Sequence, residues 1–442
     1  MRKQLYFSFN KLLSFDVDKY YKEFFNLYST NNSLVWEKKL ENVLCISSKK
    51  IPYYSKLENT QRYGLSHYPI LDKEIINTRF NQFIHIDFER NLKYGSIKVQ
   101  TGGSSGIPIT VIHDCKMRSA GRASRLFSKH LCNFPIPEAH WLLWGSMTEI
   151  NNMKNGLMGK ANNFFLNQKG IMNAFLMSED KMNTYVNLIN ENNIENLVVY
   201  VDSATELAKF IQRTGKKVKK LKNIMGCAGT ITNEDRAIIE ETFSCKLYNK
   251  YGSRECSDIA CECNQGNIHI YENHVKVEIV DNFGKTLPNG ELGRILITTL
   301  NNEAFPLIRY EIGDIGSIRH INCLCGIEGM CFEQLVGRSY EMLKNINGEY
   351  VTPVYIRHLL GVIHNPLGII NRFQLIQKDL DKYHLLLEVS KNYELKVEHL
   401  NNINIDLKKV LGVSCEIQIE ILNKIPENPN GKYSYIKTEL KN

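Results

Sequence analysis

The feature that most constrains the fold is an alternation of strand and helix patterns in the middle of the chain. The strand patterns are short apolar runs, such as HWLLW at residues 140–144, and they read as buried strands. The strand patterns are residues 140–144, 197–201 and 221–226, and the helix patterns are residues 116–130, 202–213 and 233–243. Thr232 is in position to cap the last helix. This alternation predicts an α/β core with a mainly parallel sheet.

The regions on either side of this core have different patterns. Residues 1–60 carry aromatic side chains at helical spacing, and residues 97–112 predict a hairpin around a glycine- and serine-rich turn. Residues 267–319 contain short strands separated by turns, which predicts an antiparallel, barrel-like subdomain. The length of 442 residues exceeds what one core usually supports, so at least two domains are expected. We predict a large N-terminal domain at residues 1–336 and a small α+β domain at residues 337–442.

Composition indicates an ordinary globular protein, with 43% apolar and 23% charged residues. No apolar run is long enough to span a bilayer and the start lacks a signal-peptide pattern, which predicts a cytoplasmic protein without membrane insertion. The net charge of +8 is scattered. The densest cluster of lysines, at residues 216–222, is interpreted as a solvent-exposed connection between a helix and a strand. A nucleic-acid surface is the weaker interpretation, because no aromatic residues are interleaved with the lysines.

The most informative segment for function is the turn TGGSSG at residues 101–106. Its three glycines allow a sharp turn whose N–H groups can form an anion-binding concavity, and its hydroxyls are donors suited to phosphate oxygens. No lysine stands at the Walker position, so the segment is not a P-loop. An ordinary hairpin loop is the alternative interpretation. The residues concerned are Thr101, Gly102, Gly103, Ser104, Ser105 and Gly106.

This segment resembles the phosphate-binding signature of the adenylate-forming superfamily, which comprises acyl-CoA synthetases, peptide-synthetase adenylation domains and luciferases. Four later segments resemble further motifs of that family, in the family's order. They are YGSRE at residues 251–255, RYEIGD at 309–314, GRSYE at 337–341 and GK at 431–432. Further stretches, including IPYY at 51–54 and IHIYENH at 268–274, resemble the phenylacetate–CoA ligase-like branch, which includes capsular-polysaccharide (CapK-type) proteins.

The resemblance implies an enzyme that uses ATP and Mg²⁺ to convert a carboxylic acid into an acyl-adenylate. It assigns residues 101–106 to the triphosphate, Tyr251 to the adenine ring and Asp314 to the ribose hydroxyls. It implies that Ser253 donates to the α-phosphate, that Glu255 holds Mg²⁺ and that Lys432 bridges the carboxylate and the α-phosphate. The other positions implied at the nucleotide are Gly226, Cys227, Ala228, Gly252 and, in the hinge motif, Arg338. For residues 226–230 and 251–252, an ordinary turn at a strand end is the alternative.

Two positions depart from the family pattern. Glu311 replaces a basic residue, for which Arg309 is a candidate compensation, and Tyr340 stands where the hinge usually has Asp or Lys. The second departure leaves the adenylation half-reaction better supported than the transfer step. The acceptor is therefore expected to be an amine, a hydroxyl or a thiol, with surface-polysaccharide biosynthesis as a candidate setting. The alternative is a phenylacetate-type (aryl) acid–CoA ligase. A catalytically silent nucleotide-binding relative is a further alternative.

Two short segments hold many of the cysteines. Cys263, His269, Cys323 and Cys325 together supply three sulfurs and one imidazole, a set typical of structural Zn²⁺. Cys256, Cys261 and Cys331 are alternative ligands, and buried free thiols are the alternative to a metal site.

The acyl group is expected at the carboxyl ends of the core strands, where ligands of α/β sheets bind. The candidates there are Trp144, Tyr200 and Ser203, for each of which packing in the core is the alternative interpretation. The expected partners are a small-molecule acid and an acyl acceptor. The identity of the acid and the oligomeric state do not follow from the sequence.

Overall fold

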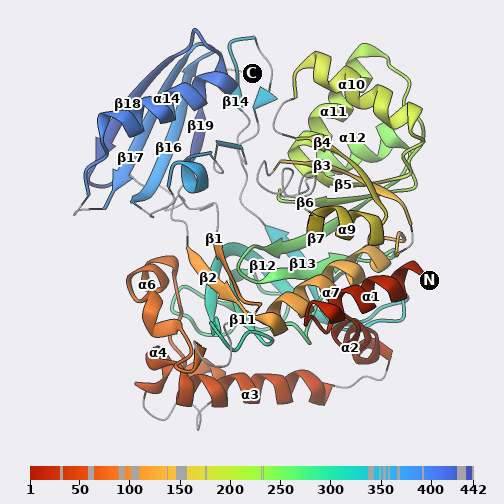
Figure 1. The fold of residues 1–442 in the computed structure, drawn as a ribbon, viewed down its shortest axis with the longest axis vertical. Helices are drawn as coiled ribbons and strands as arrows, with labels where there is room; N and C mark the ends of the chain where they lie inside the picture. Colours follow the sequence, from red (N-terminus) through yellow and green to blue (C-terminus); the bar gives the residue numbers. More distant parts are fainter. Residues whose placement is uncertain are drawn as a thin grey trace.

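The structure, a computed structural model, describes residues 1–29, 33–57, 64–88, 95–100, 109–136, 138–145, 157–174, 177–229, 231, 233–336, 343–347, 350–351, 355–356, 359–365, 369–390, 393–425 and 435–440. Its largest element is an 11-stranded mixed sheet. Figure 1 shows helices packed on this sheet and a second group of strands near the C-terminus, drawn in blue. The mixed α/β class with a C-terminal α+β region is the fold class predicted from the sequence.

One end of the large sheet is parallel, in the order β7-β6-β5-β3-β4. Its strands are β3 (His140–Trp144), β4 (Gln168–Asn173), β5 (Asn196–Tyr200), β6 (Asn223–Cys227) and β7 (Lys246–Ser253). Its helices are α9 (Leu157–Phe165), α10 (Glu179–Glu191), α11 (Val201–Thr214) and α12 (Asn233–Phe243). The alternation predicted from the sequence is confirmed, and residues 233–243 form a helix with the predicted bounds. Thr232, the expected cap, lies outside the described residues.

The other end of the sheet is antiparallel and continues from β7 in the order β7-β8-β9-β13-β12-β11-β10. Its strands are β8 (Ser257–Glu262), β9 (Ile268–Ile270), β10 (Val275–Val280), β11 (Gly293–Thr299), β12 (Tyr310–Asn322) and β13 (Glu328–Val336). The predicted antiparallel strands are thus present, and β7 joins them directly to the parallel strands.

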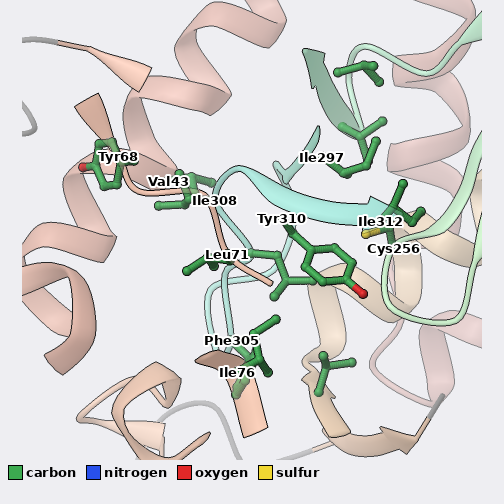
Figure 2. Packing of buried hydrophobic residues seen from close by; sticks show 14 of the residues in the cluster. Val43, Tyr68, Leu71, Ile76, Cys256, Ile297, Phe305, Ile308, Tyr310 and Ile312 are labelled. Carbon is green, nitrogen blue, oxygen red and sulfur yellow. The ribbon is translucent and has the colours of Figure 1, made fainter. Parts of the chain in front are cut away.

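The N-terminal helices and helix α7 cover these strands. They are α1 (Arg2–Leu12), α2 (Val17–Ser29), α3 (Ser33–Lys50), α4 (Pro52–Ser55), α6 (Lys73–Thr78) and α7 (Cys115–Leu131), with the 3-10 turns η1 (Leu65–His67) and η2 (Phe80–Phe83). Figure 1 shows α7 beside α1 and α2, and α7 also packs on β8. A cluster of buried apolar side chains packs α4 and η2 against the antiparallel strands. The fully buried Tyr310 belongs to it (Figure 2).

The glycine- and serine-rich turn connects two strands that pair as predicted. β1 (Ile97–Gln100) and β2 (Thr110–His113) are antiparallel, with Ile97 opposite His113 and Gln100 opposite Thr110. The turn itself, residues 101–108, lies outside the described residues.

The C-terminal part has its own core. Its elements are β14 (Leu343–Lys344), β15 (Tyr350–Val351), the π-helical turn η4 (Leu359–Ile363), β16 (Ile370–Asp379), β17 (Lys382–Val389), α14 (Val397–Leu411), β18 (Glu416–Leu422) and β19 (Ile436–Thr438). Four strands form a sheet in the order β18-β17-β16-β19, and the apolar cluster beneath it draws on residues 343–436. The side chain of Gln100 donates to the Asn365 carbonyl at 3.3 Å, so the end of β1 touches this part. No described helix is both long and apolar enough to cross a membrane.

Candidate functional site

The carboxyl ends of three parallel strands bring several predicted site residues together. Leu143 of β3 lies opposite Val199 of β5, and Tyr200 lies opposite Cys227 of β6. Trp144, Tyr200 and Cys227 therefore end neighbouring strands at one edge of the sheet. Ligands of open α/β sheets bind at this edge.

The acyl-pocket candidates differ in how they are placed at this edge. The rings of Trp144 and Tyr200 lie 4.6 Å apart between centroids at an angle of 55°. Tyr200 is buried, whereas Trp144 is partly exposed. Ser203 is fully buried in α11, and its hydroxyl donates to the Ala174 carbonyl at 2.9 Å. The two aromatic rings therefore form one wall, while Ser203 ties α11 to the end of β4.

The turn after β6 has an unusual backbone. Ala228 has a φ of 60°, in the left-handed region that non-glycine residues rarely adopt. A Cβ on Gly226 would lie 3.0 Å from Val201 and one on Gly229 would lie 3.3 Å from the Asp202 carboxylate. The turn is thus held tightly against the start of α11, and strain of this kind tends to occur at functional sites. Thr230 lies outside the described residues.

Tyr251 and Asp314 lie together although 63 positions separate them. The Tyr251 hydroxyl donates to Asp314 Oδ2 at 2.8 Å, and the Tyr251 ring meets the edge of Phe332 with centroids 5.4 Å apart. The structure therefore brings the expected adenine and ribose residues to one place. Close packing explains why glycine stands at position 252, because a Cβ there would lie 2.6 Å from the Ser257 carbonyl oxygen of β8.

Glu255 is held by Tyr310 of the RYEIGD segment. The hydroxyl of Tyr310, seen at the centre of Figure 2, donates to Glu255 Oε1 at 2.9 Å. Both residues are buried, with 0% and 6% of their surface exposed. Ser253 accepts from the Cys256 N–H at 3.1 Å, which leaves its own O–H able to donate. A charged hydrogen bond in a buried setting fixes the orientation of the carboxylate.

Both stems of the glycine- and serine-rich turn contact the segment that carries Glu255. Arg254 Nη1 donates to the Gln100 carbonyl at 3.3 Å, next to the start of the turn. His113 Nε2 lies 2.9 Å from the Glu255 carbonyl oxygen. Gln100, at the end of β1, and His113, at the far end of β2, thus both contact residues 254–255. Residues 101–106, Arg338, Tyr340 and Lys432 lie outside the described residues.

The charge of Glu311 is balanced by Arg294 of β11, which approaches it at 2.8 Å. Arg309, the compensation expected from the sequence, is buried and donates to the carbonyls of Ser66, Tyr68 and Gly284. It also pairs with Glu278 at 3.3 Å. That expectation was wrong, because Arg309 has a φ of 53° and its side chain turns into the core while that of Glu311 does not.

The four residues of the predicted metal site converge. One ligand atom from each of Cys263, His269, Cys323 and Cys325 lies within 4.8 Å of all the others. Cys263 Sγ is 3.8 Å from Cys323 Sγ, and Cys325 Sγ is 3.3 Å from His269 Nε2. Three thiols and one imidazole enclosed at this spacing fit the donor set and tetrahedral arrangement of structural zinc.

Two turns of the same form present these sulfurs, at the tips of the β8–β9 and β12–β13 hairpins. In each, the cysteine N–H donates at 2.9 Å to the carbonyl four positions later. In each, a glycine three positions after the cysteine donates back to it. These are Gly266 after Cys263 and Gly326 after Cys323, with φ values of 84° and 89°. The matching turns thus bring the sulfurs of two facing hairpins close together.

The environment of the cluster perturbs its titration. Burial lowers the pKa of His269 to about 4 and raises that of Cys325 to about 12. Burial also opposes ionisation of Cys323, but hydrogen bonds from Cys325 and Asn267 outweigh it and lower the pKa of this thiol. Cys331 lies 3.1 Å from His269 Nδ1, on the far side of the ring from Cys325. The imidazole is therefore held by its second nitrogen, as metal-bound histidines commonly are.

The other alternative ligands lie elsewhere. Cys256 is fully buried in the cluster around Tyr310. Cys261 Sγ lies 3.5 Å from Cys132 Sγ. Neither belongs to the group of converging ligand atoms found in the described part of the chain.

The chain is similar in sequence and in fold to known proteins. A family model described as the CapK C-terminal domain matches residues 343–439. The chain is 32% identical to the phenylacetate–coenzyme A ligase of Thermus thermophilus over 171 residues. This stretch covers 37% of this chain and 37% of that ligase. It is 22% identical over 273 residues to Protein CapK of Staphylococcus aureus, covering 61% of this chain and 59% of CapK. The relatives of the chain are thus phenylacetate–coenzyme A ligases and CapK, and its C-terminal part resembles that of CapK. These matches span 37% and 59% of the lengths of the two relatives.

Solved structures show the same fold over most of the chain. A 2-hydroxyisobutyryl-CoA ligase in complex with 2-HIB-AMP and CoA in the thioesterification state has a TM-score of 0.61. It is 14% identical, with 92% of this chain and 90% of that chain covered. The same ligase in the postadenylation state has a TM-score of 0.55, covering 91% and 88%. At this identity the likeness concerns the fold alone.

Several residues at the candidate site were not found from the sequence. Tyr310 and Arg254 lie inside the quoted motifs, and their neighbours in the motifs were the only signal. His113 and Arg294 follow no motif and act through contacts made by the fold. Cys331 was named only as a spare ligand, whereas in the structure it contacts the imidazole of the cluster.

Proposed function

We propose that the chain is an ATP-dependent ligase that activates a carboxylic acid as an acyl-adenylate and passes the acyl group to an amine, hydroxyl or thiol acceptor. The observation that carries this proposal is the contact of Tyr251 with Asp314 beside the buried Glu255. Both stems of the glycine- and serine-rich turn touch the segment that holds Glu255. An aromatic ring, a carboxylate for a ribose and a hairpin for phosphates together suit ATP.

Each residue has a defined task in this proposal. Tyr251 stacks on the adenine, Asp314 accepts from the ribose hydroxyls and the N–H groups of residues 101–106 bind the triphosphate. The acid carboxylate attacks the α-phosphate and pyrophosphate leaves. The O–H of Ser253 and the ammonium of Lys432 stabilise the charge that develops. Glu255 would hold Mg²⁺, which offsets the charge of the phosphate oxygens.

The acyl group is proposed to lie against Trp144 and Tyr200. These rings share the strand-end edge with Cys227 and the strained turn at Ala228. The adenine side and the acyl side of the site would then be adjacent. In the same scheme residues 337–442 form a lid domain that carries Lys432, and residues 1–336 form the adenylation core.

The test is acid-dependent exchange of labelled pyrophosphate into ATP, measured over a panel of acids. Asp314→Asn should weaken ATP binding by about tenfold, since it removes a charged acceptor of two hydrogen bonds. Asp281→Asn is the matched control, because Asp281 caps a surface turn through backbone N–H groups. Absence of exchange with every acid, together with no ATP binding, would show that the chain is a silent relative.

Two acceptors have support of different kinds. Relatives named phenylacetate–coenzyme A ligase favour a thioester product. The match to the CapK C-terminal domain favours an acceptor in surface-polysaccharide biosynthesis. Adding coenzyme A to the preformed adenylate separates them. Rapid AMP release with thioester formation would establish the ligase, and an adenylate stable to coenzyme A would direct the search to amines and hydroxyls.

We also propose that Cys263, His269, Cys323 and Cys325 bind one structural zinc ion. Four protein ligands leave no open position, so the metal would join two hairpins and would not take part in chemistry. Purified protein should contain about one zinc per chain, whereas full activity of zinc-free protein would remove any need for the site.

A further inference from the structure

Three arginines gather on one face of helix α7. Arg118, Arg122 and Arg125 occupy positions i, i+4 and i+7, which lie on the same side of a helix. The guanidinium carbons of Arg118 and Arg122 lie 4.4 and 3.9 Å from the centre of the Phe15 ring. Phe15 is buried in the connection between α1 and α2. One aromatic ring thus holds two of the cations next to each other.

The described residues around these arginines do not neutralise their charge. Arg118 donates to the Gly95 carbonyl. Arg122 and Arg125 form no ion pair and no hydrogen bond with any described residue, and Arg122 Nη1 is enclosed without an acceptor. Burial, together with the charges of Arg125 and Arg118, lowers the pKa of Arg122 to about 10. Like charges held this close are unfavourable unless an anion joins them.

Asp114 and Asp16, the carboxylates described in the adjoining segments, form no ion pair with the arginines. Asp114, which caps α7, accepts from the backbone N–H groups of Met117, Glu303 and Ala304. Asp16, next to Phe15, is exposed and forms no ion pair with the arginines. The charge is therefore left for a ligand.

The cluster lies beside the base of the β1–β2 hairpin. Gly95, which accepts from Arg118, comes just before β1. Burial lowers the pKa of His113, at the end of β2, and the nearby charges of Arg125 and Arg118 act in the same direction. His113 in turn contacts the Glu255 carbonyl. An anion bound by the arginines would therefore lie near the base of this hairpin, which His113 connects to Glu255.

We propose that Arg118, Arg122 and Arg125 bind a phosphate group carried by the acid or by the acyl acceptor. Guanidinium groups present paired donors that match phosphate oxygens, and three of them suit a doubly charged anion. The half-buried Arg122 would orient the bound phosphate, and the exposed Arg125 would contact the phosphate first as it arrives from solvent. That the phosphate belongs to a substrate rests on the proposed function, whereas the existence of the anion site does not.

Calorimetric titration with inorganic phosphate at constant ionic strength tests the site directly. The full chain is first saturated with Mg²⁺ and the α,β-methylene analogue of ATP, so that the triphosphate position is filled. Arg125→Gln and Arg122→Lys are compared with the wild type. The control is Arg213→Gln, an exposed arginine paired with Glu179. Circular dichroism confirms that each variant is folded, and Arg125→Gln keeps the test valid if the half-buried position disturbs the structure.

The expected result is saturable phosphate binding that weakens about tenfold in Arg125→Gln and is unchanged in Arg213→Gln. Equal affinity in all four proteins, or no saturable binding in the wild type, would overturn the inference. Displacement of phosphate by a phosphorylated acid would assign the group to the acid, and displacement by coenzyme A but not by pantetheine would assign it to the acceptor. If the wild type binds phosphate but shows no pyrophosphate exchange with any acid, the proposed function is contradicted and the anion site is not.

Discussion

Replacing Tyr310 by Phe removes one oxygen and tests whether the fold positions Glu255 for a metal. The hydroxyl donates to a buried carboxylate at 2.9 Å, with neither residue more than 6% exposed. Hydrogen bonds to charged groups contribute about 1.5–3 kcal/mol, so Tyr310→Phe should lower the free energy of unfolding by that amount. If Glu255 holds Mg²⁺, the same change should raise the Mg²⁺ concentration for half-maximal pyrophosphate exchange about tenfold or more.

Tyr54→Phe is the matched control for this prediction. Tyr54 lies in the same apolar cluster and is also fully buried. Among the described residues, its hydroxyl bonds to the backbone of Pro306 and Ile308 and to no carboxylate. Two neutral hydrogen bonds contribute about 1–3 kcal/mol together, so both variants should lose similar stability.

Urea unfolding followed by tryptophan fluorescence measures this loss in the N-terminal part alone, because all three tryptophans precede residue 337. A change in Mg²⁺ dependence should appear only in Tyr310→Phe. The same Mg²⁺ dependence in both variants would refute the assigned role of Glu255, and unchanged unfolding of Tyr310→Phe would refute the energetic argument.

Three further predictions concern protonation, metal content and the lid. Burial lowers the pKa of His274 from 6.5 to about 4, so the unfolded chain binds a proton that the folded chain does not between those pH values, and stability falls as pH falls. Between about pH 7 and pH 5, the free energy of unfolding measured in urea titrations should therefore fall by about 2 kcal/mol less in His274→Gln than in the wild type. Equal losses in the two proteins would contradict this. Metal analysis should show that Cys263→Ser lowers zinc content more than Cys331→Ser, because Cys331 contacts the imidazole and is not one of the four converging ligands; equal loss would make Cys331 a ligand. Lys432→Ala should abolish pyrophosphate exchange while ATP still binds in equilibrium dialysis, and unchanged exchange would remove Lys432 from the mechanism.

The parts of the fold that sequence patterns predicted are those with one dominant signal. β3 and β5 are continuous apolar runs, and the helix at residues 233–243 follows a clear strand and turn. β4, with the sequence QKGIMN, is a polar strand at the edge of the sheet and was not predicted. β12 and β16 were also missed as long strands, because both change register along their length and break the alternation of buried side chains.

Candidate site residues could be named from the sequence where a motif itself carries the chemistry. Motif order brought Tyr251 and Asp314 into one hypothesis, and their hydrogen bond shows them together. Pairing between strands is not visible in motif order. Glu311 is balanced by Arg294 because β11 and β12 are neighbours, and Cys331 meets His269 because β13 and β9 are in register there. Such partners follow from topology and not from spacing along the chain.

The contact between Tyr251 and Asp314 has a consequence for the whole sheet. β7 and β12 are separated by β8, β9 and β13, so in a flat sheet their backbones would lie about 19 Å apart. A hydrogen bond of 2.8 Å across that interval requires the antiparallel strands to curve round towards β7.

Glycines make the close backbone approaches that this curvature needs. A Cβ on Gly252 would lie 2.6 Å from the Ser257 carbonyl oxygen, and one on Gly316 would lie 2.8 Å from the Gln334 carbonyl oxygen. The twin turns at Cys263 and Cys323 lie at the tips of hairpins in this same curved region. A metal ion joining those tips would therefore hold the curvature on which the proposed nucleotide site depends, although it would contact no substrate.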